Sequence, residues 1–427
     1  MSDFAALVRR QLAADLRALP ARVRGAGGAQ QRLGPLRTIA DVRGAARRAL
    51  PRAVFDFVDG AANDELAMRR NRAAFEELAL HPRFLVDVSS VDTRTSVLGS
   101  AVPSPLLGAP TGLSGLVHPG GEAALARAVQ RDGSLYVLSG MASYSIEEVA
   151  EAASGLRWFQ LYVWKDRGFV RDLLRRAADA GYRALVVTVD APRSGARERD
   201  VRNGFSLPPR ITLRSLLDGA LHPRWSAGFV RHSRFVLANT PPRLEPGDGG
   251  QDPLALVEYF ASQFDASVTW SDLSWLREQW PGPLVVKGLM RGDDALSAVE
   301  AGADAIWVSN HGGRQLDDAP SALSALPAVA DAVGTRAEVY FDSGIRRGSD
   351  VIKALALGAR ACFVGRPLLY GLAVAGEEGA HHAFRLLRRE LELTLALTGC
   401  ASVADLPSAS LLSPGSGGRA SSPAEAS

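Results

Sequence analysis

The sequence contains few lysines and cysteines, and its net charge is small. Only three lysines stand beside 46 arginines among 427 residues, and the formal net charge is +3. The 49 basic and 46 acidic residues form no long block of one sign, which argues against a nucleic-acid-binding arm. The 47% hydrophobic content excludes a chain that is disordered throughout. Two cysteines, Cys362 and Cys400, cannot form a disulfide framework, which favours a reducing compartment.

The sequence also lacks the long apolar segments and the glycine motifs of several large protein classes. No apolar run approaches the roughly 18 residues of a transmembrane helix, and the amino-terminal residues lack the apolar core of a signal peptide. We therefore expect a cytoplasmic protein. No predicted strand is followed by GxGxxG, and no P-loop motif occurs, so neither nucleotide-binding fingerprint is present.

The two ends of the chain differ in composition from its centre. Residues 1–37 are rich in Arg and Ala, contain GAGG at 25–28, and predict a short helix on a linker. The carboxyl-terminal sequence SPGSGGRASSPAEAS predicts a disordered tail over residues 408–427. The folded body is predicted to span residues 38–407.

Eight short apolar segments alternate with amphipathic helical patterns inside this body. Such strands, separated by helices, predict a parallel sheet that is covered on both faces. Eight units of this kind predict an α/β fold, the TIM (β/α)8 barrel, with a doubly wound sheet as the alternative. The predicted strands are residues 105–110, 135–140, 158–163, 184–190, 284–289, 305–311, 338–344 and 361–367.

A long insertion interrupts the repeat after the fourth strand. More than ninety residues separate that strand from the fifth, far beyond a normal βα loop. Residues 205–262 are predicted to form a lid-like insertion on the carboxyl-terminal face of the barrel, where such barrels hold their active sites. The alternative is a membrane-docking segment that uses Trp225, Phe229 and Phe235.

Polar residues gather at the carboxyl ends of the predicted strands, which are the catalytic positions of a TIM barrel. Gly344, Gly365 and Arg366 follow the last two strands and fit a phosphate site, because they offer backbone N–H groups and a guanidinium. A plain glycine turn is the alternative at that point. The other polar strand ends are Gln160, Tyr162, Thr188, Asp190, Lys287 and the segment SNHGGRQLD at 309–317.

His311 is the strongest candidate for a catalytic base. It precedes two glycines that permit close approach of a flat ligand, and Arg314 can pair bidentately with a carboxylate. Histidine takes up protons near neutral pH, and a carboxylate such as Asp190 can orient it. A structural histidine is the alternative for one residue taken alone. A metal site is not predicted, because His311 has no partners at metal-ligand spacing.

Over residues 38–407 the sequence closely resembles the FMN-dependent 2-hydroxy acid oxidase and dehydrogenase family, which includes glycolate oxidase, lactate oxidase, flavocytochrome b2 and mandelate dehydrogenase. The resemblance lies in several specific segments, which occur in order along the chain. They are VFDFVDGAANDE (54–65), APTGLSGLVHPGGE (109–122), FQLYVWKDR (159–167), TVDAPRSGARERD (188–200), VKGL (286–289), SNHGGRQLD (309–317) and DSGIRRGSDVIKALALGA (342–359).

The resemblance implies FMN as the cofactor and a role for each matching residue. His311 would take a proton from the substrate with Asp190 as its partner, and Arg314 would bind the substrate carboxylate. Tyr162 and the nearby Arg197 would also contact the substrate. Lys287 would stabilise negative charge on the reduced flavin. The other residues implied to bind the cofactor are Pro110, Thr111 and Gly112 beside N5, Ser139, Gln160 and Thr188 at the ring, Asp342, Gly344, Arg346, Gly365 and Arg366 at the phosphate, and Ser309 and Ser343.

One substrate-binding position departs from the family pattern. The family commonly has a tyrosine where this sequence has Phe57, and the lost hydroxyl would weaken carboxylate binding by about 1.5–3 kcal/mol. Gly112 and Met141 leave room for a larger side chain in the family's site. We therefore expect an L-2-hydroxy acid that is lactate- or mandelate-like, with a bulky or aromatic side chain as one form. The alternatives are an acid derivative, an amine, or a catalytically silent flavin-binding barrel.

The resemblance implies partners only in outline. The electron acceptor is expected to be oxygen, a quinone or a cytochrome, and the chain is expected to form a homotetramer. No nucleic-acid partner and no metal are predicted. The protein is expected in the cytoplasm. Contact of the insertion with a membrane would make it peripheral to the inner face of that membrane.

Overall fold

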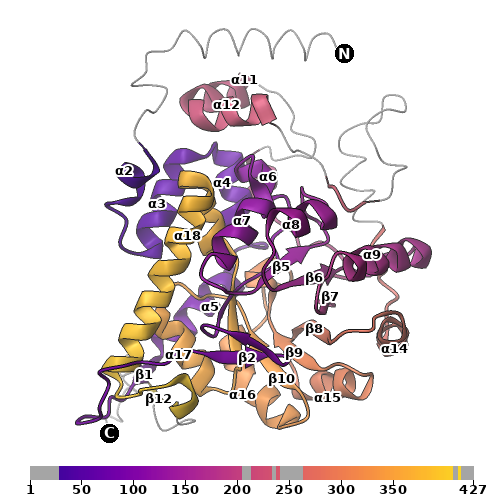
Figure 1. Cartoon of the computed structure of the whole chain (residues 1–427). Helices are drawn as coiled ribbons and strands as arrows, with labels where there is room; N and C mark the ends of the chain where they lie inside the picture. Colours follow the sequence, from indigo (N-terminus) through magenta and orange to yellow (C-terminus); the bar gives the residue numbers. More distant parts are fainter. Residues whose placement is uncertain (1–27, 204–212, 233–236, 241–262, 407–411, 415–427) are drawn as a thin grey trace, which may run out of the picture.

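Eight parallel strands form a closed barrel in the computed structural model of the protein (Figure 1). The structure describes residues 28–203, 213–232, 237–240, 263–406 and 412–414. Around the barrel the strands follow the order of the chain, and the last pairs with the first, which confirms the TIM-barrel prediction. The strands are β4 (Leu106–Gly108), β5 (Tyr136–Ser139), β6 (Arg157–Leu161), β7 (Leu185–Thr188), β8 (Leu284–Leu289), β9 (Ala305–Val308), β10 (Glu338–Phe341) and β11 (Ala361–Val364).

Amphipathic helices cover the outer face of the barrel. In α9, residues Val170, Leu173, Leu174 and Ala177 are spaced by one helical turn and are buried, and Asp166 caps the first turn through the N–H of Phe169. The covering helices are α6 (Ser114–Val117), α7 (Gly121–Gln130), α8 (Ile146–Ala152), α9 (Arg167–Asp179), α14 (Trp270–Gln279), α15 (Gly292–Glu300), α16 (Ala322–Val333), α17 (Gly348–Ala356) and α18 (Arg366–Leu397).

Aromatic side chains fill the inside of the barrel. Trp158, Trp307, Tyr340 and Phe363 lie in one buried cluster, and the Trp307 and Phe363 rings stack with centroids 3.7 Å apart. A hairpin of β2 (Thr95–Val97) and β3 (Ser100–Val102) packs against the same cluster. This packing leaves the carboxyl ends of the strands as the place for a site.

The folded body begins earlier than residue 38. Helix α2 (Ala29–Leu33) lies in the predicted linker, yet Leu33 and the following Leu36 are buried in the main core. The Arg32 Nε donates to the Val374 carbonyl of α18 over 3.1 Å. The buried leucines explain the difference, because they add apolar contacts with α18 that the Arg- and Ala-rich composition hides. Helices α3 (Ile39–Ala49), α4 (Arg52–Asp59) and α5 (Leu66–Glu76) follow.

A short strand also lies within the predicted disordered tail. Strand β12 (Leu412–Pro414) pairs antiparallel with β1 (Leu78–Leu80). The disorder prediction is therefore wrong for these three residues, whose backbone groups find partners on β1. The other residues of the predicted tail, 408–411 and 415–427, lie outside the described residues.

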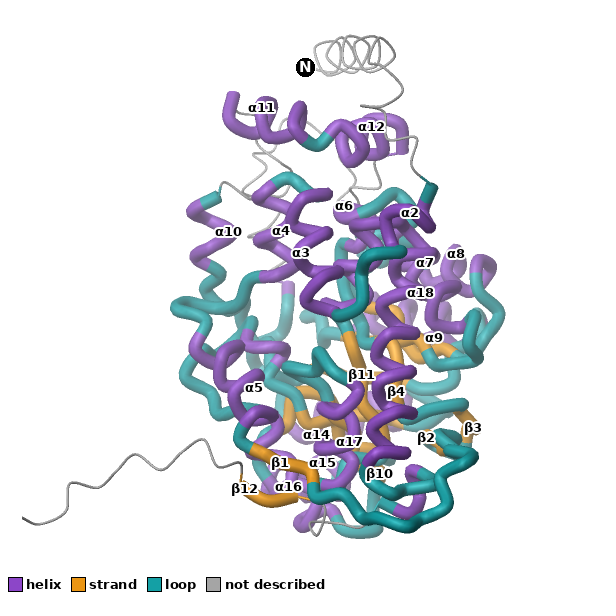
Figure 2. Tube along the Cα trace, turned by 90° about the vertical axis from the view of Figure 1, so that its left-hand side faces the viewer, coloured by secondary structure: helices purple, strands orange, loops and turns teal. Residues whose placement is uncertain are grey.

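The insertion after β7 contains a pair of helices that stands on the body. Helices α11 (Leu213–Leu221) and α12 (Pro223–His232) lie together above α3, α4 and α6 (Figures 1 and 2). The predicted docking residues Trp225 and Phe229 are partly buried, because their rings stack on each other and pack against the core, and the Trp225 indole donates to the Leu116 carbonyl. Phe235 and most of residues 205–262 lie outside the described residues. In the part of the chain that is described, no helix is both long and apolar enough to cross a membrane.

Candidate active site

Three neighbouring strands end in a row of buried, hydrogen-bonded polar side chains. The Ser139 hydroxyl of β5 donates to the Gln160 amide oxygen of β6 over 3.0 Å. The Gln160 amide nitrogen donates to the Thr188 hydroxyl of β7 over 3.0 Å. These are the polar residues at the carboxyl ends of their strands, and the chain of bonds fixes the direction in which each remaining donor and acceptor faces.

A buried lysine and aspartate form the next part of the floor. The Lys287 ammonium lies 3.1 Å from Asp342 Oδ2 and donates to the Ser309 hydroxyl over 2.8 Å. Ser309 in turn donates to Asp342 Oδ1 over 2.6 Å. Lys287 is only 4% exposed, and its ion pair and hydrogen bond offset the cost of burying a cation.

A bulge in β8 lets Asp190 approach this floor. Gly288 has a φ of +109° at the register shift between Lys287 and Leu289. A Cβ on Gly288 would lie 2.7 Å from the Asp190 side chain, closer than atoms can approach. Glycine at this position therefore allows Asp190, which follows β7, to lie beside the end of β8.

His311 and Asp190 form the central pair of the site. The His311 Nδ1 lies 3.0 Å from Asp190 Oδ1, and its Nε2 lies 3.4 Å from the Tyr162 hydroxyl. Burial alone would raise the pKa of Asp190, but His311 and Lys287 outweigh burial and lower it. His311 has a φ of +58°, in the left-handed region that non-glycine residues rarely adopt. The ring is thus held through Nδ1, and Nε2 faces the cavity.

Two arginines lie against the ring of Phe57. The guanidinium carbons of Arg314 and Arg197 lie 5.3 and 5.8 Å from the centre of its ring. Arg314 donates to the carbonyls of Phe57 and Gly60, and no carboxylate among the described residues forms an ion pair with it. Burial, and then the charges of Arg197 and Arg366, lower the pKa of Arg314 to about 9. An anionic ligand would relieve this repulsion.

A second group of cations lies at the ends of β10 and β11. Arg366 donates to the carbonyls of Val58, Gly60 and Gly312, and burial lowers its pKa. Ser343 and Gly344 have φ values of +88° and +90°, and a Cβ on Gly344 would lie 2.5 Å from the Asn71 carbonyl oxygen. Backbone N–H groups in such a turn, together with Arg346 and Arg366, fit the oxygens of a phosphate.

These groups surround one cavity of about 590 Å³. Its walls carry five cations and two carboxylates among the described residues, so the cavity suits anionic ligands. Two predicted site residues, Asp190 and Ser309, lie behind the wall and contact His311, Lys287 and Asp342 instead. The predicted residues that line it are Phe57, Pro110, Thr111, Gly112, Ser139, Gln160, Tyr162, Thr188, Arg197, Lys287, His311, Arg314, Asp342, Ser343, Gly344, Arg346, Gly365 and Arg366.

The sequence analysis missed several residues of the wall, among them Leu237, Phe264 and Asp200. Leu237 and Phe264 come from the insertion and its end, and the Phe264 ring stacks on Tyr162 with centroids 4.8 Å apart. Asp200 lies 3.6 Å from Arg197 and is buried. The motif TVDAPRSGARERD contains Asp200, but no strand end marks it. The repeat of strands and helices does not predict that Leu237 or Phe264 lies at the cavity, because both belong to the segment between two repeat units.

The comparisons with known proteins agree with this geometry. Residues 46–413 match the family described as FMN-dependent dehydrogenase. The chain belongs to the FMN-dependent dehydrogenase family. It is 48% identical to an L-lactate oxidase of Nostoc sp. over 365 residues, which cover 84% of this chain and 94% of the relative. It is 44% identical to a putative L-lactate dehydrogenase of Mycobacterium tuberculosis over 378 residues, 88% of this chain and 89% of the relative.

Solved structures of other proteins resemble this FMN-dependent dehydrogenase closely. A crystal structure of a monotopic membrane protein, (S)-mandelate dehydrogenase, shares 41% identity and a TM-score of 0.84, and covers 89% of this chain and 100% of that chain. A mandelate oxidase with (S)-4-hydroxymandelic acid shares 37% identity and a TM-score of 0.77, and covers 88% of this chain and 98% of that chain.

Family membership confirms that the protein is an FMN-dependent 2-hydroxy acid oxidase or dehydrogenase. The donor set fits FMN: a buried amide and two hydroxyls for the ring, a buried lysine, and two guanidiniums beside the Ser343–Gly344 turn for one phosphate. The enzyme is thus an oxidoreductase, as the sequence motifs implied.

Proposed function

We propose that the protein oxidises a 2-hydroxy acid with a bulky apolar side chain, an aromatic acid such as mandelate being the first candidate, to the 2-keto acid. The proposal rests on the contact of His311 Nδ1 with Asp190, which leaves Nε2 directed at a cavity that also contains Arg314. A base, an anion-binding group and a cofactor-sized cavity then meet in one place.

His311 would accept a proton from the substrate at Nε2. A general base must lie within hydrogen-bond reach of its proton, and the carboxylate on Nδ1 favours the charged ring that results. Tyr162 keeps its proton, because burial first and Asp190 second raise its pKa, so its hydroxyl can donate to the substrate. The oxidation removes two electrons and two protons from the substrate; His311 would take one proton, and bound FMN would supply the acceptor of the two electrons and the other proton.

Arg314 would bind the substrate carboxylate. Its guanidinium is anchored to the α4 carbonyls by Nη1, and it has no carboxylate partner in the part of the chain that the structure describes. Arg197 also lies against the Phe57 ring and would add a second cation. Two guanidiniums can replace much of the hydrogen bond that a tyrosine at position 57 would supply.

The cofactor would lie on the polar floor. Ser139, Gln160 and Thr188 would contact the ring, and Lys287, which pairs with Asp342, would stabilise negative charge near it. The segment of Pro110, Thr111 and Gly112 would face the reacting edge. The residues proposed to hold the phosphate are Ser343, Gly344, Arg346, Gly365 and Arg366.

An apolar wall of the cavity favours a substrate with a bulky apolar side chain. Phe57, Met141, Leu237 and Phe264 line the cavity together. Burial of an aromatic ring gains about 25 cal/mol per Å² of apolar area, which a small acid cannot gain. Several similar solved structures are of enzymes named for mandelate.

Anaerobic mixing of the purified protein with a panel of 2-hydroxy acids tests this function. We expect the flavin absorbance to bleach faster with (S)-mandelate than with glycolate or lactate. Equal bleaching by all three would contradict the substrate preference. No bleaching by any acid, but bleaching by an ester, amide or amine, would favour the alternative substrates, and no bleaching at all would favour a silent flavin-binding barrel.

We also propose that α11 contacts a membrane surface. Leu217 and Leu221 are 61% and 79% exposed, Leu216 is also exposed, and the exposed Arg224 lies nearby on α12. Exposed leucines beside arginines suit an interfacial helix on an anionic membrane. One similar solved structure is of a monotopic membrane protein.

Co-sedimentation with anionic vesicles tests this contact. The double variant Leu217→Ser/Leu221→Ser should reduce binding. The matched control is Leu393→Ser/Leu397→Ser, which removes two leucines of similar exposure from α18. Equal binding by the two variants would contradict the contact.

The proposal also covers the oligomeric state, the electron acceptor and the location of the protein. A homotetramer is expected to appear by light scattering of the purified protein. Oxygen, a quinone and a cytochrome are distinguished by adding each to the substrate-reduced enzyme and following the return of flavin absorbance. A cytoplasmic enzyme bound to the inner face of the membrane would be recovered in the membrane fraction and released by detergent.

A further inference from the structure

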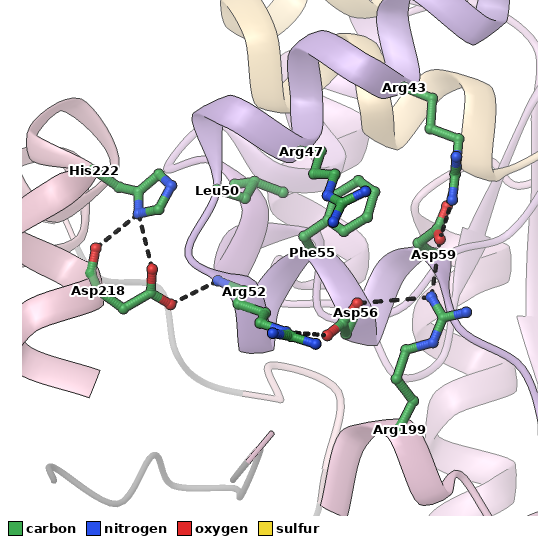
Figure 3. Close-up of a pocket in the computed structure, with 10 residues that line it drawn as sticks. All are labelled: Arg43, Arg47, Leu50, Arg52, Phe55, Asp56, Asp59, Arg199, Asp218 and His222. Carbon is green, nitrogen blue, oxygen red and sulfur yellow. Dashed lines mark hydrogen bonds and ion pairs between the residues drawn. The ribbon is translucent and has the colours of Figure 1, made fainter. Parts of the chain in front are cut away.

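A second cavity, of about 390 Å³, lies apart from the active site (Figure 3). Helices α3 and α4 form one side of it, α10 (Glu198–Arg202) forms another, and the end of α11 with His222 closes it. Its charged residues are Arg43, Arg47, Arg52, Arg199, Asp56, Asp59, Asp218 and His222. None of them takes part in the chemistry proposed above.

The deepest carboxylate of this cavity is already neutralised. Arg43 donates to both oxygens of Asp59 over 2.5 and 2.7 Å, Arg199 donates over 2.9 Å, and the Tyr370 hydroxyl donates over 2.7 Å. Burial alone would raise the pKa of Asp59, but these donors hold it well below its ordinary value. The Asp59 carboxylate is therefore fully paired and would not attract a further cation into the cavity.

The other two carboxylates are also engaged. Asp56 accepts from the Asn203 amide over 2.7 Å and lies 3.5 Å from Arg52 Nε. Asp218 accepts from the backbone N–H of Arg52 over 2.7 Å and lies 3.2 Å from His222 Nδ1. Both acids thus have partners from the walls of the cavity.

Arg47 is the cation without a counter-charge. Among the described residues, no hydrogen-bond acceptor or carboxylate contacts its guanidinium, and Figure 3 draws no interaction to it. Arg52 has only the long contact with Asp56, and both contacts of His222 involve Nδ1, which leaves Nε2 available. The guanidiniums of Arg47 and Arg52 therefore remain as donors for an anion, and Nε2 of His222 is a further polar atom of the cavity.

We propose that this cavity binds a phosphate-type oxyanion, the headgroup of an anionic phospholipid, through Arg47, Arg52 and His222. Guanidiniums bind phosphate oxygens with paired, charge-assisted hydrogen bonds. The choice of a lipid rests on the membrane contact proposed above for α11.

The chain around Asp218 connects the cavity with the exposed leucines. Asp218 and His222 are four residues apart and face the cavity, whereas Leu217 and Leu221, also four apart, face solvent. Residues at this spacing share one face of a helix. A lipid whose tail lies along the leucines would therefore have its headgroup beside Arg52 and His222.

The test uses the full-length, FMN-bound protein and two kinds of vesicle, phosphatidylcholine alone and phosphatidylcholine with phosphatidylglycerol. We expect Arg47→Gln to weaken binding to the phosphatidylglycerol vesicles at least about tenfold. Arg48→Gln removes the same charge from the same helix, outside the cavity, and should cost no more than about fivefold. The two variants should not differ on phosphatidylcholine alone.

Calorimetric titration with inorganic phosphate separates the two sources of the anion. Binding that is lost in Arg47→Gln but not in Arg48→Gln, with vesicle binding equal in both variants, would assign the cavity to a soluble phosphate ester. Equal behaviour of the two variants in both assays would overturn the proposal. Binding of the wild type and of Leu217→Ser/Leu221→Ser to the same vesicles is measured alongside, so failure of the cavity and failure of the proposed membrane contact are distinguished.

Discussion

The imidazole of His311 is held by Asp190 through one nitrogen and directed into the cavity through the other. The Nδ1–Oδ1 distance is 3.0 Å, and the Nε2 atom lies 3.4 Å from the Tyr162 hydroxyl. Asp190 can reach this position only because Gly288 has no side chain. The pair is therefore built by three segments, the end of β7, the bulge of β8 and the loop after β9.

Replacing His311 by Gln should abolish most substrate oxidation and leave FMN bound. Loss of a general base lowers the rate about 10²- to 10⁴-fold, while the cofactor contacts of Gln160, Lys287 and Arg366 remain. Stopped-flow flavin reduction measures the rate, and the visible spectrum reports bound FMN. Asp190→Asn should also slow reduction, because an amide cannot stabilise the charged ring. A rate for His311→Gln within about tenfold of wild type would contradict the assignment.

Phe57→Tyr should improve small 2-hydroxy acids more than aromatic ones. A hydroxyl at this position would add a charge-assisted hydrogen bond to the carboxylate, worth about 1.5–3 kcal/mol. In the variant, a small acid would owe much of its affinity to that new bond, whereas an aromatic acid also uses the apolar wall beside Phe57. The measurement is kcat/KM for lactate and for mandelate in both proteins. An equal gain for both acids would show that Phe57 does not determine the preference.

Lys287→Met should destabilise the protein unless its partner is also changed. Removing one member of a buried ion pair costs about 3–5 kcal/mol, because Asp342 would be left buried without its counter-charge. The double variant Lys287→Met/Asp342→Asn should recover much of this loss, as urea unfolding of the FMN-free protein would show. Lys165→Met, at an exposed lysine, is the control. Additive losses in the double variant would mean that the two residues do not form an energetic pair.

Glu122 should make the stability of the protein fall as pH rises from about 4.5 to about 6. Its carboxylate is fully buried, Oε1 accepts from the Ser114 N–H, and Oε2 has no partner among the described residues. Burial raises the pKa of Glu122 to about 6, so the folded protein holds this proton more tightly than the unfolded chain does. The stabilisation that this proton provides is therefore fully present below the pKa of the unfolded chain and is lost as pH rises through the pKa of the folded protein. The free energy of unfolding should change by about 2 kcal/mol.

The variant Glu122→Gln should remove this pH dependence, which urea unfolding measured across the interval would detect. Glu300→Gln, at an exposed glutamate on α15, should leave the pH dependence unchanged. An identical pH profile for Glu122→Gln and wild type would refute the prediction.

The barrel could be predicted because its strands are buried on both faces and its repeat is regular. The segment 284–289 is apolar except at Lys287 and Gly288, and the structure places β8 over the same residues. The predicted strands elsewhere extend one to three residues too far, because polar ends such as Asp342 and Gly344 already belong to loops. Strands β1, β2, β3 and β12 were missed because three residues carry no periodic signal.

The insertion was the least predictable part of the candidate site. Composition identified Trp225 and Phe229 as apolar but could not tell which side of α12 meets the body. The Trp225 indole finds its acceptor on Leu116, more than one hundred residues earlier in the chain, so the large aromatic side chains face inward. The exposed apolar face belongs instead to α11. Leu237 and Phe264 reach the cavity from a segment whose position no barrel repeat determines.

Helix α4 is a common wall of the two cavities. Phe57 and Val58 line the larger one, and Asp56 and Asp59 line the smaller one. The carbonyls of α4 and Gly60 accept hydrogen bonds from Arg314 and Arg366. A ligand that shifts α4 from either side must change the affinity for the ligand on the other side by the same factor. The KM for substrate would then differ between free enzyme and enzyme attached to a lipid surface. Substrate would likewise change the fraction of enzyme that is attached.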